Sequence, residues 1–131
     1  MSGLVEHNIK KTAKKNTGFR KELDVGDFAE LAVMSLPPGG ELGEEVHNHA
    51  DEILVVIRGK GEAVVNGQKR LTRKHDVLFV SAGHRHNLTN TGKRDLKLIT
   101  VFSPPCFGKK GAGHQAGARK IEERLRHAWE Q

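Results

Sequence analysis

The chain has 131 residues, of which 36% are hydrophobic and only 5% aromatic, and it carries a formal net charge of +6. This length allows one domain with a real core and is too short for two. No apolar run approaches the roughly 18 residues that cross a bilayer, and the first residues include no apolar segment of signal-peptide length. A single cysteine, Cys106, excludes an internal disulfide. We therefore expect a cytoplasmic protein without a membrane partner.

The positive charge lies at the two ends of the chain. Residues 1–21 hold six Lys or Arg against one Glu, and residues 109–131 hold six against three acids. Residues 22–108 are slightly acidic, with ten Lys or Arg against twelve Asp or Glu. The basic residues near the start have no aromatic residues between them and belong to no nucleic-acid motif. We expect residues 1–21 to form a disordered, solvated arm, and we do not expect nucleic-acid binding.

Short apolar segments follow one another at intervals of about ten residues, with turn signals between them. Asn66-Gly67 predicts a tight type I′ hairpin between two of them. The expected strands cover residues 28–36, 44–49, 53–57, 63–65, 68–72, 76–80, 86–90 and 96–102. This pattern is typical of an all-β antiparallel sandwich or barrel, which we place in residues 22–108.

The last part of the chain, residues 109–131, has a different character. Ile121, Leu125, Ala128 and Trp129 recur at helical spacing, with Arg and Glu residues between them. We expect a short amphipathic C-terminal helix that packs on the barrel or on a second subunit.

Two clusters hold side chains of the kinds that bind metals. The second cluster, residues 81–90, contributes His86. The first lies within residues 39–61 and carries Glu45, His47, His49, Asp51 and Glu52. Alternate residues of an extended strand point to the same side, so a strand over residues 44–49 would align three of these side chains. Imidazole nitrogens and carboxylate oxygens crowded at the mouth of a strand indicate a divalent metal site.

The spacing of the first cluster resembles a signature motif of the cupins, small antiparallel β-barrels with a jelly-roll topology that surround a metal. The motif runs from Gly39 to Gly59. Five residues separate Gly39 from Glu45-Val46-His47, four more precede Glu52, and six more precede Gly59. The sequence departs from the motif at Glu45, where the family usually has a histidine.

The second cluster resembles the second cupin motif. Gly83, His86 and Asn90 match its spacing, whereas His75 and Ser81 stand where the family usually has Gly and Pro. The stretch FSPPCFGKKGAGH, which follows the last expected strand, is similar to the tail of small single-domain cupins labelled mannose-6-phosphate-isomerase-like. Several of those also carry Glu in place of the first histidine.

The resemblance implies which residues would hold the metal: Glu45, His47, Glu52 and His86. Two alternatives stay open, since His49 could displace Glu45 and Asp51 could replace Glu52. Two imidazoles and two carboxylates favour Mn or Fe, with Zn or Ni as the alternatives. The resemblance also implies a homodimer, with residues 28–36 and the helix that carries Trp129 as candidate surfaces.

Three classes of function remain open at this point. The first is a metal-dependent enzyme on a small oxygen-rich molecule such as a sugar or small acid, for example an isomerase, epimerase, decarboxylase or dioxygenase. In this enzyme His49 or Asp51 could shuttle protons, although the sequence assigns no catalytic residue. The second is a non-catalytic module that binds a small molecule or metal, and the third is polyanion binding through the basic ends. The fold does not choose among them, because one scaffold hosts many chemistries.

Overall fold

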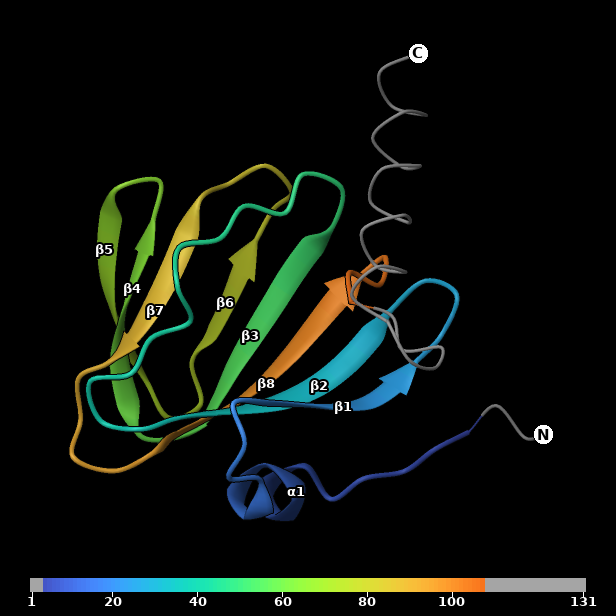
Figure 1. Cartoon of the computed structure of the whole chain (residues 1–131), viewed down its shortest axis with the longest axis horizontal. Coiled ribbons are helices and arrows are strands. Elements are labelled where there is room, and N and C mark those ends of the chain that lie inside the picture. The colour runs from blue at the N-terminus through green and yellow to red at the C-terminus, as the bar shows by residue number, and fades with distance from the viewer. Residues whose placement is uncertain (1–3, 108–131) are drawn as a thin grey trace.

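A computed structural model of the chain describes residues 4–107, which form two antiparallel β-sheets facing each other (Figure 1). The five-stranded sheet has the order β1-β2-β8-β3-β6, and the three-stranded sheet has the order β5-β4-β7. The strands are β1 Arg20–Val25, β2 Glu30–Leu36, β3 Asp51–Arg58, β4 Lys60–Val65, β5 Gln68–Arg73, β6 Val77–Val80, β7 His86–Asn90 and β8 Leu96–Ser103. The predicted antiparallel β architecture is confirmed. The predicted C-terminal helix falls in residues 109–131, outside the described part of the chain.

The core fills the space between the two sheets. Because side chains alternate along a strand, the strands that contribute to this core each present one face to it. Leu54 and Val56 of β3 and Leu98 of β8 come from the five-stranded sheet, and Ala63 and Leu88 come from the three-stranded sheet. All five are at most 1% exposed, so little of this row reaches solvent.

The turn chemistry that the sequence predicted is present. Asn66 and Gly67 both have positive φ, 49° and 81°, as a type I′ hairpin between β4 and β5 requires. β2 is buried on both faces, with Met34 facing the main core and Val33 facing outward against a second, smaller apolar cluster.

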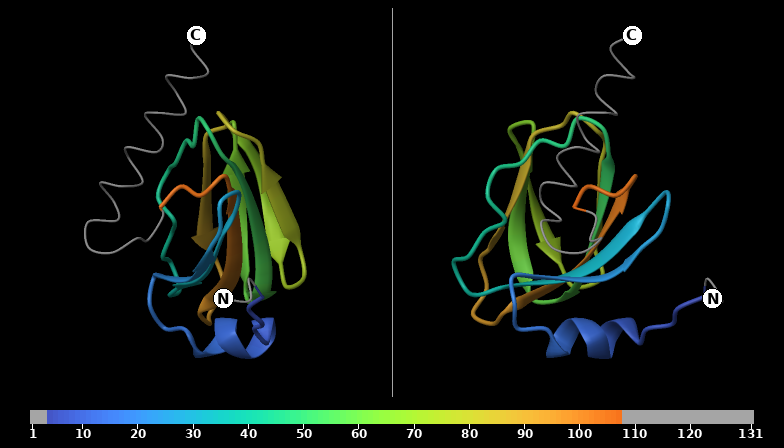
Figure 2. Two further views of the ribbon diagram at one scale, coloured as in Figure 1. Left: turned by 90° about the vertical axis from the view of Figure 1, so that its right-hand side faces the viewer. Right: turned by 45° about the vertical axis from the view of Figure 1, so that its right-hand side comes forward.

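The prediction of a disordered arm over residues 1–21 is wrong for the part that the structure describes. Helix α1, Ile9–Lys15, lies against the outer face of the five-stranded sheet, and β1 begins at Arg20 (Figure 2). The predicted domain start at residue 22 therefore falls inside a strand. The Asn8 side chain caps the helix by accepting from the Lys11 amide at 3.0 Å. α1 is too short to cross a membrane, and no other helix lies within residues 4–107.

Two contacts fix α1 to the sheet. Ala13 is fully buried against Val33 and Ile99. At the C-terminal end of the helix, the ammonium group of Lys97 in β8 donates to the Asn16 carbonyl at 2.5 Å, which is favourable at the negative end of a helix. Burial is the main reason why the pKa of Lys97 lies below its usual value. These residues are part of the scaffold and lie on the opposite side of the sheet from the core.

Candidate metal centre

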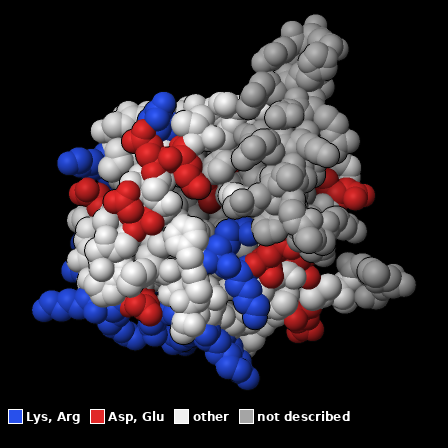
Figure 3. All heavy atoms as spheres, in the orientation of Figure 1, with Lys and Arg blue, Asp and Glu red and all other residues white. Residues whose placement is uncertain are grey.

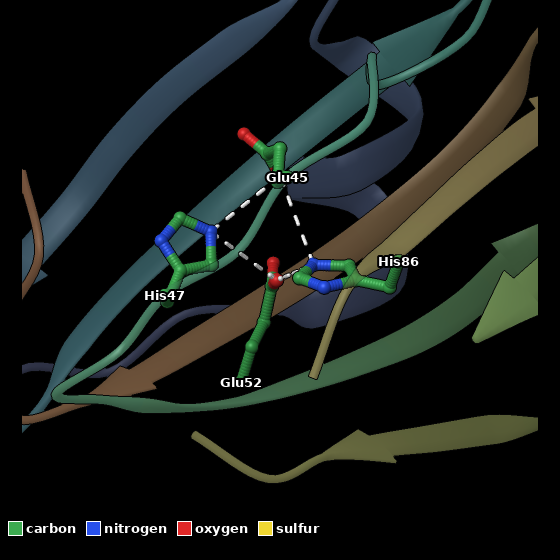
Figure 4. A group of neighbouring side chains, drawn as sticks. All are labelled: Glu45, His47, Glu52 and His86. Atoms are coloured by element: carbon green, nitrogen blue, oxygen red, sulfur yellow. Dashed lines mark hydrogen bonds and ion pairs between the residues drawn. The ribbon is translucent and has the colours of Figure 1, made fainter. Parts of the chain in front are cut away.

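Four side chains converge at one end of the space between the sheets (Figure 4): Glu45, His47, Glu52 and His86. One possible ligand atom from each lies within 4.8 Å of the others. His47 Nε2 is 3.5 Å from Glu45 Oε1 and 3.9 Å from Glu52 Oε1. His86 Nε2 is 2.8 Å from Glu52 Oε1 and 3.8 Å from Glu45 Oε1. Atoms that each bind one ion at about 2.1 Å lie roughly 3–4 Å apart. Three of these four distances therefore suit a metal, while the 2.8 Å distance between His86 and Glu52 is that of a hydrogen bond. We call this group the Glu/His cluster.

The cluster draws on both sheets. Glu52 is the second residue of β3 in the five-stranded sheet, and His86 is the first residue of β7 in the three-stranded sheet. Glu45 lies directly beside His86, because the two residues exchange backbone hydrogen bonds of 2.8 and 2.9 Å. Residues opposite each other in an antiparallel pair point to the same side, which brings the Glu45 carboxylate next to the His86 ring.

The predicted strand over residues 44–49 does not form. Glu45 makes only an isolated bridge, and the chain turns at Asn48 and His49. The His47 carbonyl accepts a 2.8 Å hydrogen bond from the Gly83 amide, which ties this loop to the second cupin-like motif. Glu45 and His47 therefore meet in the cluster as expected, while the turn carries His49 away from it.

The alternative ligands lie outside the cluster. The Asp51 side chain accepts from the Ala82 amide at 2.9 Å, so its oxygen holds the loop before β7. His49 does not belong to the group of side chains that meet within 4.8 Å. The arrangement thus brings together the four preferred residues and neither alternative. That the four bind a metal ion remains a prediction.

Two of the donors are oriented by further hydrogen bonds. The Nδ1 of His86 is 3.0 Å from the His84 carbonyl, which accepts its proton and turns Nε2 toward the cluster. The Thr100 hydroxyl donates to Glu52 Oε2 at 2.7 Å and leaves Oε1 facing the histidines. Outer hydrogen bonds of this kind fix ring and carboxylate orientation in metal sites.

The donor set also fits a metal electrostatically. Nε2 of His47 is buried, makes no hydrogen bond and faces both carboxylates. Burial pulls the pKa of His86 down, but its hydrogen bonds to Glu52 and to the His84 carbonyl, together with the charge of Glu45, outweigh burial and raise that pKa. Two carboxylates in one buried site need compensating positive charge, which a divalent ion would supply.

A cavity of about 270 Å³, which we call the cluster cavity, adjoins two of the four side chains, Glu45 and Glu52. It is lined by the two carboxylates of the cluster, one arginine and an apolar wall: Glu45, Glu52, Arg20, Phe19, Met34, Phe102 and Phe107. Phe102 also packs edge-on against the His47 ring, with ring centres 4.9 Å apart. Arg20 and Phe107 were not predicted as site residues, because no spacing pattern in the sequence pointed to them.

Some motif positions have structural roles. The Asn90 amide donates 2.8 Å hydrogen bonds to the carbonyls of Leu36 and Arg94 and is 1% exposed, so it holds two loops together. Gly59 has a φ of 97°, and an added Cβ would lie 3.1 Å from the backbone of Leu96. His75 stands where the motif usually has glycine and keeps the glycine-like φ of 77°.

Known proteins share this sequence pattern. The chain is 33% identical over 104 residues to the uncharacterized protein YrkC of Bacillus subtilis, aligning 75% of this chain with 56% of that protein. It is 29% identical over 101 residues to the mannose-1-phosphate guanylyltransferase ManC of Salmonella typhimurium, which covers 77% of this chain and 21% of the relative. The chain thus spans about half, or less, of the length of these curated relatives.

Solved structures share the fold. BH2720 from Bacillus halodurans superimposes with a TM-score of 0.79 at 28% identity, over 89% of this chain and 93% of that one. A predicted oxalate decarboxylase from Thermotoga maritima gives a TM-score of 0.61 at 29% identity, over 64% of this chain and 77% of that one. The Cupin domain family model matches residues 32–102, a span of more than half the chain that includes all four residues of the Glu/His cluster. Facing antiparallel sheets, both motifs and the family match lead to one conclusion: the chain belongs to the cupin family.

Proposed function

We propose that the protein binds a divalent metal ion through the Glu/His cluster and uses it to bind a small oxygen-rich molecule, either a sugar or a small acid. The observation that carries the proposal is the buried Nε2 of His47, which faces two carboxylates without a hydrogen bond. A buried polar atom without a partner is rare in folded proteins, and an ion bound there would remove the penalty.

The donor types support Mn²⁺ or Fe²⁺ as the first choice. Carboxylate oxygens shift the preference of an imidazole site toward these harder ions, while Zn²⁺ and Ni²⁺ remain compatible with two imidazoles. Four protein ligands on an ion that prefers six leave positions for oxygens of a ligand. When bound, such an ion would act as a Lewis acid that polarises a carbonyl or hydroxyl oxygen.

The side chains of the cluster cavity suggest how a ligand would be held. Glu45, whose side chain is 32% exposed, is the most accessible member of the cluster and borders the cavity. Phe102 and Phe107 form an apolar wall that limits water around a bound molecule. The similarity to ManC and to a predicted oxalate decarboxylase agrees with a sugar or small acid as ligand. An isomerase, epimerase, decarboxylase or dioxygenase activity fits this class of ligand.

The test begins with the metal. Purified protein, prepared without a nickel column, is analysed for metals by mass spectrometry and then titrated with Mn²⁺, Fe²⁺ and Zn²⁺. We expect about one ion per chain, and a protein that takes up none of these ions would refute the proposal. Metal-loaded protein is then assayed with sugars, keto acids and diketones, with and without O₂. Turnover supports an enzyme, whereas ligand binding without turnover supports a non-catalytic binding module.

A second candidate is polyanion binding, which one feature of the surface favours. Lys and Arg side chains gather along the lower edge of the molecule, around α1 (Figure 3). Repulsion by Lys10 is the main reason why the pKa of Lys14 is lowered, followed by partial desolvation and by the charges of Lys74, Arg58 and Arg94. Cations from the helix and from the loops beneath the barrel are therefore close enough to act together on a phosphate backbone.

The test of this candidate uses substitutions, because deleting residues 1–21 would remove α1 and the start of β1. Replacing Lys10 and Lys14 with Glu should abolish salt-dependent binding of a short DNA duplex. The same change at Lys69 and Arg70, which are exposed on β5, serves as the control. Absence of DNA binding by the wild-type protein at low salt rejects this candidate.

A further inference from the structure

Three turns meet at the end of the sandwich opposite the Glu/His cluster. β3 and β7 begin at the cluster, with Glu52 and His86, and their far ends lead into the β3–β4 turn and the β7–β8 turn. The β5–β6 turn lies at the same end, at the bottom of Figure 1, because the His75 amide donates to the Val56 carbonyl at 2.8 Å. An open pocket of about 520 Å³, which we call the basal pocket, is lined by residues of all three turns: Gly59, Lys60, Arg73, Lys74, Thr91, Gly92, Lys93 and Arg94.

The charge of the basal pocket is of one sign. Its described lining contains no acid and five exposed cations: Lys60, Arg73, Lys74, Lys93 and Arg94. Within residues 4–107, none of these five side chains forms an ion pair with a carboxylate. The neighbouring acids have other partners. Asp76 accepts from the Arg73 backbone amide at 2.8 Å, and the Asp95 carboxylate is 3.8 Å from the Lys97 ammonium. A cleft lined by one sign of charge concentrates ions of the opposite sign.

The like charges at this end of the molecule act on one another. The pKa of Lys14 in α1 is lowered, chiefly by Lys10 and by desolvation. Lys74, Arg58 and Arg94 lower it further, and two of these three line the basal pocket from different turns. Figure 3 shows Lys and Arg side chains along this lower edge of the molecule. Bringing like charges together costs free energy, and a bound anion would remove that cost.

The turns that carry these cations are held in place by hydrogen bonds. The buried Asn90 side chain accepts from the Gly92 amide and donates to the Arg94 carbonyl, both at 2.8 Å, and so fixes the β7–β8 turn. The Thr91 amide donates to the Lys60 carbonyl at 3.3 Å, which joins this turn to the β3–β4 turn. A pocket whose backbone is already ordered loses less conformational entropy when a ligand binds.

These features restrict the class of ligand. Several unpaired cations favour an anion that carries several charges in a compact space. Arg and Lys side chains together suit phosphate groups, whose oxygens accept from several donors at once. No aromatic side chain is among the described residues that line the pocket, so a nucleobase would have no ring on which to stack. The volume of about 520 Å³ is that of a small-ligand pocket and accommodates a short chain of phosphates.

We propose that the basal pocket binds an oligophosphate, a short chain of phosphate groups that is either free or the tail of a nucleotide. This site lies away from the proposed metal centre and does not depend on it. It also differs from the polyanion candidate, because its contacts come from the three turns and a short phosphate chain is sufficient to make them.

The experiment is a calorimetric titration of the full chain with tripolyphosphate. The protein is first treated with EDTA and dialysed, because tripolyphosphate would chelate a divalent ion. We expect saturable binding at one site per chain, and this binding should weaken when the salt is raised to about 0.3 M. ATP should bind as well, and whichever of the two binds more tightly identifies the free or the nucleotide-borne chain as the ligand. Orthophosphate and citrate should bind about tenfold more weakly or less.

Matched variants locate the site. Lys93→Gln combined with Arg94→Gln removes two charges from the β7–β8 turn and should weaken tripolyphosphate binding about tenfold or more. Lys69→Gln combined with Arg70→Gln removes the same charge from exposed positions of β5 outside the pocket and should bind like the wild type. Circular dichroism confirms that both variants are folded.

Three results would overturn the basal pocket: no saturable binding of tripolyphosphate, equal affinities in the two double variants, or citrate and orthophosphate that bind as tightly as tripolyphosphate. Wild-type protein that binds tripolyphosphate but no DNA duplex supports the basal pocket and rejects the polyanion candidate alone. Because the titration uses metal-free protein, a failure of the proposed metal site would leave its outcome unchanged.

Discussion

The position of Glu45 decides the character of the proposed metal site. Its backbone is paired with His86, so its carboxylate faces the cluster without needing a strand over residues 44–49. With a histidine there, the donor set would be three imidazoles and one carboxylate. With glutamate, the donor set contains two carboxylates, which are harder ligands than imidazole and balance the charge of a divalent ion.

Substitution of single ligands tests this assignment. Glu45→Ala and His86→Ala should each lower the affinity for Mn²⁺ by roughly 100-fold or more, since removal of even an outer hydrogen-bond partner costs 10–100-fold. His49→Ala should change affinity little, because His49 lies outside the cluster. Isothermal titration calorimetry with folded variants measures the difference. Full metal affinity in Glu45→Ala would return the assignment to His49.

The affinity for the metal should also depend on pH through His86. The proton and the metal compete for Nε2, and the raised pKa means that protonation begins at a higher pH than for an ordinary imidazole. We expect Mn²⁺ affinity to fall about tenfold per pH unit below that pKa. The metal-free protein should show the opposite trend, because a raised folded-state pKa adds stability below the unfolded pKa and loses it as pH rises through the folded pKa. Titrations and urea unfolding between about pH 5.5 and 8 measure both, and a flat metal affinity would contradict the role of His86.

The four cluster residues could be predicted from the sequence because the spacing of the two motifs matches a known pattern, although Glu45 and His47 lie in a loop and not in the predicted strand. Arg20, Glu30 and Phe107 could not, because three remote segments bring them together. Arg20 meets Glu30 only through the β1–β2 pairing, and Phe107 joins them only when the chain after β8 packs back. Neither the β1–β2 pairing nor the packing of the segment after β8 can be recognised from the spacing of residues in the sequence.

At the scale of elements, the strands from β2 to β8 were predictable because their apolar residues and turns are local signals. α1 and β1 were missed for a shared reason. The helix IKKTAKK is only seven residues long and mostly lysine, and β1 alternates charged residues with few apolar ones. Tertiary contacts, chiefly through Ala13, stabilise what the local sequence does not.

The role of Ala13 can be measured. Ala13→Asp would place a charge against Val33 and Ile99 and should lower the free energy of unfolding by about 2–4 kcal/mol. Lys11→Asp, at an exposed position of the same helix, should stay within about 0.5 kcal/mol of the wild type. Urea denaturation followed by circular dichroism gives both values. Equal stability of the two variants would show that α1 contributes little to the barrel.

At the scale of the whole molecule, the structure changes which surface suits the expected homodimer. β2 lies between β1 and β8, and its outward residue Val33 is covered by α1, so the strand Glu30–Leu36 offers little to a partner, although Phe28 just before it is 80% exposed. The β6 edge is different. Val77 and Phe79 are 59% and 64% exposed, and Phe79 lies beside Ile53 in the adjacent strand.

We propose that this β6 face pairs with a second copy of the chain, because exposed apolar side chains at a sheet edge mark association surfaces. Phe79→Asp should convert a dimer to a monomer, as measured by sedimentation velocity. Leu71→Asp, at an equally exposed position of β5, should leave the assembly unchanged. A wild-type monomer at micromolar concentration, or a dimer that survives Phe79→Asp, argues against this surface.

The division of the Glu/His cluster between the two sheets has a mechanical consequence. Glu52 belongs to the five-stranded sheet, whereas His86 belongs to the three-stranded sheet and Glu45 is paired with it. A bound ion would therefore connect the two sheets at one end of the sandwich. Chelation should therefore loosen that end first, before global unfolding. Hydrogen exchange is expected to accelerate at the amides of Glu45, Gly83 and His86 when the metal is removed. The β4–β5 hairpin contributes no residue to the cluster, so its amides should keep their protection from exchange. Metal removal would thus open the sandwich at one end and leave the rest folded.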